Sequence, residues 1–191
     1  MRLYLASTSP RRRDLLAAAR IPFECVPPGD EPDGAGPPAE VAMRRAASKC
    51  VGARVPEGAP AGIVLGVDTV VDLDGVELGK PRDRAEARAM LRALAGRVHA
   101  VHTAHCVRRH PGTGVAAREL TTARVAIAAL DAVAIEAYLD EDEWQDKAGA
   151  YGIQGAAGRF CTLVDGELDT VIGLSVAAVR RLLAAAGSGP P

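Results

Sequence analysis

The chain has 191 residues, 48% of them hydrophobic, which is enough for one sizeable core. Its 23 basic and 24 acidic side chains give a net charge of −1, which excludes any overall attraction to nucleic acid or to an anionic membrane. The sequence contains no apolar run of the roughly 18 residues that a membrane helix needs, and no signal-peptide stretch. We therefore expect a cytoplasmic domain whose anion chemistry comes from local clusters of charge.

Cysteine and lysine are used sparingly. The cysteines Cys25, Cys50, Cys106 and Cys161 are scattered without a C-x-x-C pair, which argues against a zinc knuckle and indicates reduced thiols. The chain holds 20 arginines and three lysines. A lysine retained under such a bias marks a position where a compact ammonium group serves better than a planar guanidinium.

The apolar periodicity alternates between strands and helices along the chain, as in an α/β fold. In order it predicts a strand at 2–6, a helix at 10–19, a strand at 22–27, a helix at 39–53, a strand at 63–67, a hairpin at 70–78, a helix at 83–94, long strands at 97–108 and 115–128, a helix at 131–139, a hairpin of strands at 160–164 and 167–172, and a helix at 174–185. Residues 27–38 form a Pro/Gly-rich loop with three carboxylates, and the acidic run 140–143 is interpreted as a solvated connection.

The turn after the first strand is rich in hydroxyl and guanidinium groups. Ser9 suits the N-cap of the following helix, and Pro10 suits its first position. The free backbone N–H groups and positive dipole end of that helix would face the end of the strand, where Arg11 and Arg12 add charge. The turn is therefore a candidate phosphate site. An ordinary strand-to-helix turn with solvated arginines is the alternative.

The strand at 63–67 has the continuous apolar character of a strand buried on both faces, and Asp68 and Thr69 follow it. Open α/β sheets bind ligands at the carboxyl ends of their strands, so Asp68 is a candidate to present a carboxylate to a ligand; a turn cap is the alternative. The next hairpin contains an Asp-Gly turn and could return Lys80 to the side of Asp68.

Three histidines, His99, His102 and His105, occur on one predicted strand at spacings of three. Successive side chains of a strand point to opposite faces. The three are therefore not expected to converge on a metal ion.

The segment 146–155 places small residues around Lys147, Tyr151 and Gln154. Such a backbone can approach a planar ligand closely, although a tight loop packed under a sheet has the same composition. The amide of Gln154 offers both a donor and an acceptor, which would match the imide-like edge of uracil or thymine.

Four motifs together resemble the Maf family of nucleoside triphosphate pyrophosphatases, which is related in fold to the inosine triphosphatase group. They are S-x-S-P-R-R at 7–12, G-x-D-T at 66–69, G-K-P at 79–81 and D-K-A-G-A-Y-G-I-Q-G at 146–155. The resemblance implies one α/β domain over 1–186, with a mixed twisted sheet, flanking helices and two lobes around a central cleft. A disordered tail is expected at 187–191.

The resemblance also implies an activity, which is hydrolysis between the α and β phosphates of a nucleoside triphosphate with Mg²⁺ or Mn²⁺. Asp68 matches the family's catalytic carboxylate, the proton acceptor that activates water. The positions that match the phosphate path, where they would neutralise charge on the departing pyrophosphate, are Ser7, Arg12, Lys49 and Lys80.

Substrate choice is implied by a further set of matches. Arg11, Thr69 and Gln154 match the subgroup acting on dTTP and UTP. Hydrolysis of 7-methyl-GTP or of another modified nucleotide is one alternative, and a non-catalytic regulator of septum formation is another.

The sequence indicates the metal ligands and the partners less directly than it indicates the phosphate-binding residues. The family shows an acidic pair after the second strand, and here the register is ambiguous between Asp30 and Glu31. We expect Glu31 and Asp68 to hold the metal, since carboxylate oxygens suit Mg²⁺ and Mn²⁺. The expected partner is a small-molecule nucleoside triphosphate, without nucleic acid or membrane, in a homodimer.

Overall fold

The structure is a computed structural model that describes residues 2–32 and 34–187. Its strands are β1 (Arg2–Ala6), β2 (Glu24–Val26), β3 (Gly62–Leu73), β4 (Val76–Leu78), β5 (Val98–His110), β6 (Val115–Ile127) and β7 (Cys161–Asp165). Its helices are α1 (Pro10–Ala18), α2 (Pro38–Val51), α3 (Arg84–Leu94), α4 (Ala132–Leu139), α5 (Leu168–Ile172) and α6 (Val176–Gly187), with short 3-10 turns η1 (Ala148–Ala150) and η2 (Ala156–Arg159).

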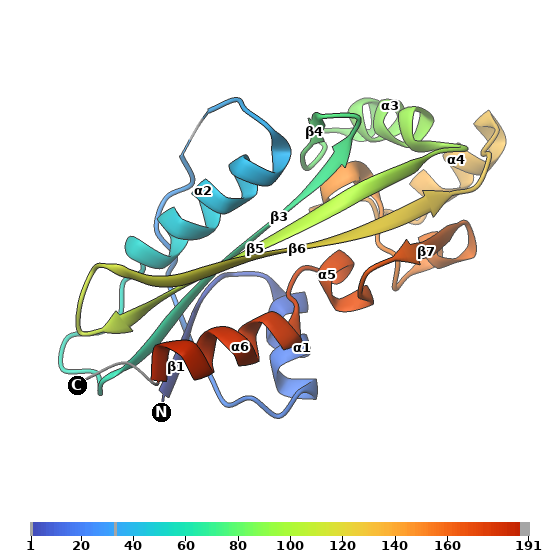
Figure 1. The fold of residues 1–191 in the computed structure, drawn as a ribbon. Coiled ribbons are helices and arrows are strands. Elements are labelled where there is room, and N and C mark those ends of the chain that lie inside the picture. The colour runs from blue at the N-terminus through green and yellow to red at the C-terminus, as the bar shows by residue number, and fades with distance from the viewer. Residues whose placement is uncertain (1, 33, 188–191) are drawn as a thin grey trace.

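The described strands form a mixed sheet in the order β2-β1-β3-β5-β6-β7, with β4 paired to β3 outside this path (Figure 1). The strand β1 runs parallel to both of its neighbours, while the remaining pairs are antiparallel. The mixed α/β architecture expected from the sequence is confirmed.

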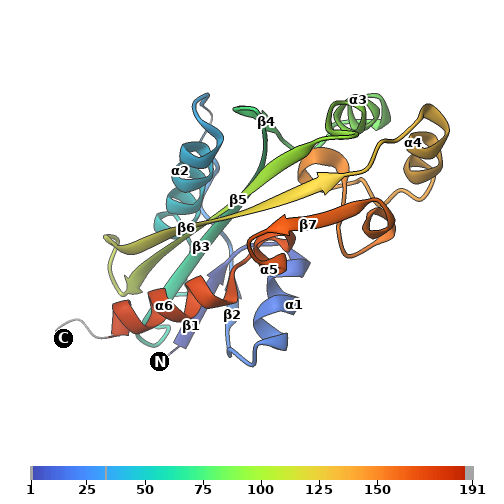
Figure 2. The same cartoon turned by 45° about the vertical axis from the view of Figure 1, so that its right-hand side comes forward.

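Helices cover both faces of the sheet, with α2 on one face and α1 and α6 on the other (Figures 1 and 2). The alternation of β1 explains this layering, because neighbouring side chains of a strand point to opposite faces. Leu3 and Leu5 pack in the cluster of α1 and α6, whereas Tyr4 and Ala6 pack in the cluster of α2.

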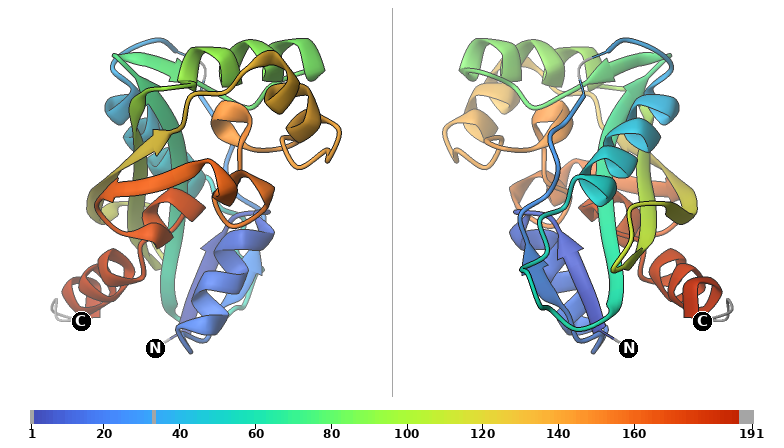
Figure 3. Two further views of the ribbon diagram at one scale, coloured as in Figure 1. Left: turned by 90° about the vertical axis from the view of Figure 1, so that its right-hand side faces the viewer. Right: turned by 90° about the vertical axis from the view of Figure 1, so that its left-hand side faces the viewer.

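Two lobes are joined by the long strands β3, β5 and β6 (Figure 3). One lobe contains β1, β2 and α1. The other contains α3, α4 and the segment around η1, whose apolar side chains form a separate core cluster that includes Leu91, Tyr138 and Phe160. The two clusters that include β1 and the separate cluster of the other lobe agree with the expectation of two lobes.

The strand β3 corrects the position predicted for Asp68. It continues without a break from Gly62 to Leu73, so Asp68 lies inside the strand and not at its end. It stays in the strand because β5 pairs with it throughout, Asp68 lying opposite Ala104. The parallel neighbour β1 ends at Ala6, opposite Gly66, so Asp68 still lies beyond the carboxyl end of an adjacent strand.

A second correction concerns residues 167–172, which were expected to form a strand and instead contain α5. The β-branched residues of this stretch favour a strand locally, but tertiary contacts favour the helix. The carbonyl oxygen of Thr170 accepts the hydroxyl of Thr103, and a carboxylate oxygen of Asp169 accepts the N–H of Val176 at the start of α6.

The end of the chain differs slightly from the expected tail. The helix α6 includes Gly187, the first residue assigned to the tail, and residues 188–191 lie outside the described residues. Among the residues that the structure describes, no helix has the length and apolar character needed to cross a membrane.

We expect Gly66→Ala to lower the free energy of unfolding by about 1–3 kcal/mol, the usual cost of overpacking a filled core. A Cβ at this position would lie 2.4 Å from the carbonyl oxygen of Ala46 and 2.5 Å from the amide nitrogen of Cys50, so α2 would have to move away from the sheet. Urea unfolding measures the loss. Gly114→Ala is the control, because a Cβ there meets no described atom within 4 Å. Equal stability of the two variants would contradict the expectation.

Candidate active site

A cavity of about 870 Å³ receives side chains from both lobes. The turn at 7–12 and α2 contribute from one side, and the segment 143–155 contributes from the other. All the residues that the sequence nominated line this cavity: Ser7, Ser9, Arg11, Arg12, Glu31, Lys49, Asp68, Thr69, Lys80 and Gln154. Lys147 lines it too, so all three lysines of the chain face one cavity.

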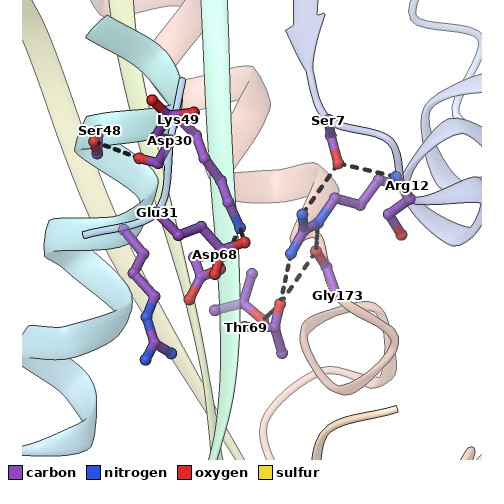
Figure 4. A network of polar contacts seen from close by, with 12 residues as sticks. Ser7, Arg12, Asp30, Glu31, Ser48, Lys49, Asp68, Thr69 and Gly173 are labelled. Atoms are coloured by element: carbon purple, nitrogen blue, oxygen red, sulfur yellow. Dashed lines mark hydrogen bonds and ion pairs between the residues drawn. The ribbon is translucent and has the colours of Figure 1, made fainter. Parts of the chain in front are cut away.

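Arg12 is buried and is held by neutral oxygen atoms (Figure 4). Its Nε donates to the carbonyl oxygen of Gly173 at 2.8 Å, its Nη1 to the hydroxyl of Ser7 at 3.1 Å, and its Nη2 to the hydroxyl of Thr69 at 3.3 Å. Burial lowers the pKa of Arg12 to about 10, and the nearby Asp68 opposes that effect. These contacts fix the guanidinium without neutralising its charge, so the site favours an anion.

Asp68 forms a buried ion pair with Lys49 of α2, and the distance from Lys49 Nζ to Asp68 Oδ1 is 2.6 Å (Figure 4). Burial raises the pKa of Asp68, while Lys49 acts in the opposite direction. The second oxygen, Oδ2, is buried and has no hydrogen-bond partner among the described residues. Buried polar atoms are almost always satisfied, so this oxygen is placed to accept from a bound water or to contact a cation.

Glu31 also contacts Lys49, because its Oε1 lies 2.7 Å from the ammonium nitrogen. The neighbouring Asp30 contributes its backbone carbonyl instead, which accepts the hydroxyl of Ser48 at 2.7 Å. Gly29 ties this loop to α2 by donating its N–H to the carbonyl oxygen of Lys49. Of the two acidic residues between which the sequence left the register open, the structure therefore brings the Glu31 carboxylate to Lys49 and Asp68.

Lys80 reaches the cavity after β4, but it lies beside Asp146 and not beside Asp68. Its ammonium nitrogen is 3.8 Å from Asp146 Oδ1, and 65% of its side chain is exposed. The preceding residue, Gly79, accepts the N–H of Gly149. This backbone contact holds the lysine against the segment 146–155.

The three residues matched to substrate choice occupy two places. Arg11 donates to the carbonyl oxygen of Asp146 at 3.3 Å, next to the segment that carries Gln154. Thr69 lies instead on the Arg12 side, where its hydroxyl also lies 3.0 Å from that of Thr103. Thr69 therefore contacts Arg12 and not the segment that carries Gln154.

Ser9 occupies the expected N-cap position and Pro10 begins α1. Within the described residues the Ser9 side chain makes no capping hydrogen bond, and its backbone N–H donates to Ser7 Oγ at 3.2 Å. The start of α1 therefore remains available to an anion in the cavity.

The histidines each have separate contacts. His99 Nε2 lies 2.6 Å from the hydroxyl of Tyr151, and His105 Nε2 accepts the N–H of Ser175. Burial lowers the pKa of both to about 4, so both are neutral near pH 7. They act as packed hydrogen-bonding groups within the fold.

Three charged cavity residues, Arg45, Glu77 and Glu143, were missed by the sequence reasoning. Arg45 lies one helical turn before Lys49 and pairs with Glu77 of β4 at 2.5 Å; its spacing to Lys49 was an available signal. Glu143 was assigned to a solvated acidic connection, but it is half-buried and accepts the N–H of Ala156 at 2.8 Å. Its partner lies 13 residues away, and no local pattern indicates that contact.

Comparison with known proteins identifies relatives over the whole chain. The family described as "Maf-like protein" matches residues 2–186. A dTTP/UTP pyrophosphatase of Anaeromyxobacter sp. is 44% identical over 100% of this chain and 92% of its own length. A dTTP/UTP pyrophosphatase of Thermococcus gammatolerans is 42% identical, with 94% of each chain covered.

Among solved structures, a nucleoside-triphosphatase / dITP/XTP pyrophosphatase of Mycobacterium abscessus is 15% identical, with a TM-score of 0.38 over 69% of this chain and 76% of that chain. The family match covers nearly the entire described chain and includes all four motifs singled out in the sequence. The chain therefore belongs to the Maf family.

Proposed function

We propose that the protein hydrolyses dTTP and UTP to the nucleoside monophosphate and pyrophosphate. The observation that carries this proposal is that one cavity gathers a buried cation, Arg12, whose hydrogen bonds go to neutral oxygens, a buried carboxylate, Asp68, and an amide, Gln154, suited to a base edge. The relatives named as dTTP/UTP pyrophosphatases, at 40–44% identity over nearly the whole chain, support it.

Phosphate binding rests on the turn after β1. Arg12 offers a charge that neutral contacts hold in place, and the start of α1 adds free N–H groups and a positive dipole end. Lys80 is exposed at the opposite wall and can move toward the leaving pyrophosphate. Cations placed in this way stabilise the charge that develops as the bond between the phosphates breaks.

Asp68 is the proton acceptor in this mechanism. Lys49 holds Oδ1 and favours the ionised form, while burial makes the carboxylate a stronger base than an exposed aspartate. The Asp68 carboxylate accepts a proton from water as the water oxygen bonds to the α-phosphorus and the bond to the bridging oxygen breaks. The products are the monophosphate and pyrophosphate.

The donor set fits a divalent metal such as Mg²⁺ or Mn²⁺. Asp68 Oδ2 is buried without a partner among the described residues. The carboxylate of Glu31 contacts Lys49, the lysine that also pairs with Asp68. Hard cations prefer such oxygen ligands, and when bound the ion would neutralise phosphate charge and acidify water. The described residues contain no cluster of three or more metal-ligating side chains, so substrate and water oxygens would complete its coordination.

Base selection is assigned to Gln154 and to Arg11, which donates to Asp146 of the same segment. An amide presents a donor and an acceptor together, and a site that hydrogen-bonds one base edge rejects an analogue that leaves its polar groups unpaired. Thr69 contributes indirectly through its contact with Arg12.

Assembly as a homodimer and a cytoplasmic location remain predictions.

A nucleotide panel tests the substrate assignment. We expect pyrophosphate release from dTTP and UTP to exceed that from 7-methyl-GTP, ITP and CTP, by about tenfold or more in kcat/KM, because a mismatched base edge leaves polar groups unpaired. Product analysis should give the monophosphate and pyrophosphate in equal amounts. Faster turnover of 7-methyl-GTP or ITP than of both dTTP and UTP would overturn the assignment.

Asp68→Asn tests the proton acceptor. We expect kcat to fall by about 10²- to 10⁴-fold, since the amide cannot take a proton from water. Asp72→Asn on the same strand is the control, because Asp72 serves a turn by accepting the N–H of Gly75. Turnover of Asp68→Asn at the wild-type rate would exclude the mechanism. A septum phenotype that persisted in this inactive variant would instead favour the regulatory alternative.

Metal removal tests the ligand assignment. We expect EDTA to abolish hydrolysis and added Mg²⁺ or Mn²⁺ to restore it. In Glu31→Gln the metal concentration for half-maximal activity should rise about tenfold, equivalent to ~1.4 kcal/mol, because one anionic ligand is lost. Asp30→Asn is the matched control, since Asp30 uses its backbone carbonyl. Full activity in EDTA, or equal metal dependence of the two variants, would contradict the assignment.

A further inference from the structure

Gln154 is presented to the cavity by a tight turn. The N–H of Gly155 donates to the carbonyl oxygen of Gly152 at 3.0 Å, which closes the turn, and Ala156 begins the short helix η2 directly afterwards. The direction of the Gln154 amide therefore depends on what holds this turn.

Glu143 contacts the turn from the other end of the segment. Its side-chain Oε2 accepts the N–H of Ala156 at 2.8 Å, and its backbone carbonyl accepts the ammonium group of Lys147. A single residue thus connects the beginning of the segment to the end of the turn. Its carboxylate is half-buried in the cavity wall.

The two glycines of the turn leave room for the side chains that hold it. A Cβ on Gly155 would lie 1.9 Å from Glu143 Oε2, and a Cβ on Gly152 would lie 2.6 Å from Lys147 Cε. Both distances are under 3.0 Å, which is closer than a Cβ atom approaches a nonbonded atom. The carboxylate of Glu143 therefore occupies the space that glycine at 155 leaves open.

We propose that Glu143 is a positioning residue for nucleobase selection, which acts by fixing the turn that carries Gln154. The inference rests on the proposed function, since it requires Gln154 to contact the base edge. A hydrogen-bonding group discriminates between bases only when its own orientation is fixed by surrounding contacts. Glu143 supplies such a contact at the residue that ends the turn.

The test compares dTTP with dCTP, because cytosine replaces the carbonyl and N3–H of thymine with an amino group and an acceptor nitrogen. We expect Glu143→Ala to reduce the ratio of kcat/KM for dTTP to that for dCTP by about tenfold, mainly through a higher KM for dTTP. Glu143→Gln should keep the ratio within about threefold of the wild type, since its amide oxygen can still accept the N–H of Ala156.

Glu141→Ala is the matched control, because Glu141 lies two residues earlier in the same acidic run and pairs with Arg159 at an exposed position. It should leave the ratio unchanged. The inhibition constant for inorganic pyrophosphate should be the same in all variants, since the hydrogen bonds of Glu143 go to Ala156 and Lys147 and not to Arg12 or Lys80. Thermal unfolding of each variant reports on folding.

A double-mutant cycle tests the contact itself. Gly155→Ala should lower the dTTP/dCTP ratio in the wild type, and should have little added effect in Glu143→Ala, where the space for a Cβ is vacant. Additive effects would overturn the proposal, and so would a Glu143→Ala variant that keeps wild-type discrimination or loses kcat equally on both nucleotides. A wild-type enzyme that does not prefer dTTP to dCTP would instead overturn the proposed function.

Discussion

The buried contact between Lys49 and Asp68 is the constraint on which the rest of the site depends. Their side chains are only 10% and 8% exposed. A buried ion pair contributes little net stability compared with an apolar pair, but leaving either charge alone costs about 3–5 kcal/mol. The pair therefore fixes where α2 lies on β3, and Gly66 allows the two backbones to approach closely enough. Packing of the core and placement of the carboxylate follow from the same contact.

Arg12, the other buried cation of the site, differs from Lys49 in the kind of group that it contacts. Lys49 faces two carboxylates, whereas the hydrogen bonds of Arg12 go to a carbonyl and two hydroxyl oxygens. The hydroxyl of Thr69 is supported by that of Thr103, which in turn donates to α5. These hydrogen bonds orient Arg12 but do not neutralise its charge, so the guanidinium can still bind an anionic ligand. This difference separates a cation that holds the carboxylate from one that is suited to phosphate.

Local signals in the sequence were sufficient for most of the fold, since apolar period and turn motifs are properties of short segments. They also indicated part of the cavity, whereas Ser7, Glu31 and Lys49 were expected there only from the resemblance to the Maf family. Local signals failed where the decisive partner is distant. The apolar run ends at Val67, yet the strand continues through Asp68, because β5 pairs with it there and Lys49 of α2 satisfies the carboxylate. Residues 167–172 resemble a strand but form α5 through contacts with β5 and α6. Glu143 resembles solvated charge, because its contact with the turn depends on the folded chain.

The surroundings of the lysines in the cavity explain why lysine, and not arginine, stands at these positions. Lys49 places one ammonium nitrogen within 2.7 Å of both Glu31 and Asp68, and the stem of Lys147 lies against Gly152. A planar guanidinium is wider and presents its donors as a fork, so it fits poorly between two carboxylates on different elements. Arg12 contacts three acceptors spread around its plane, where that fork is an advantage. The choice between the two cations at each position therefore follows from the shape of the space and the arrangement of its acceptors, even in a chain whose composition strongly favours arginine.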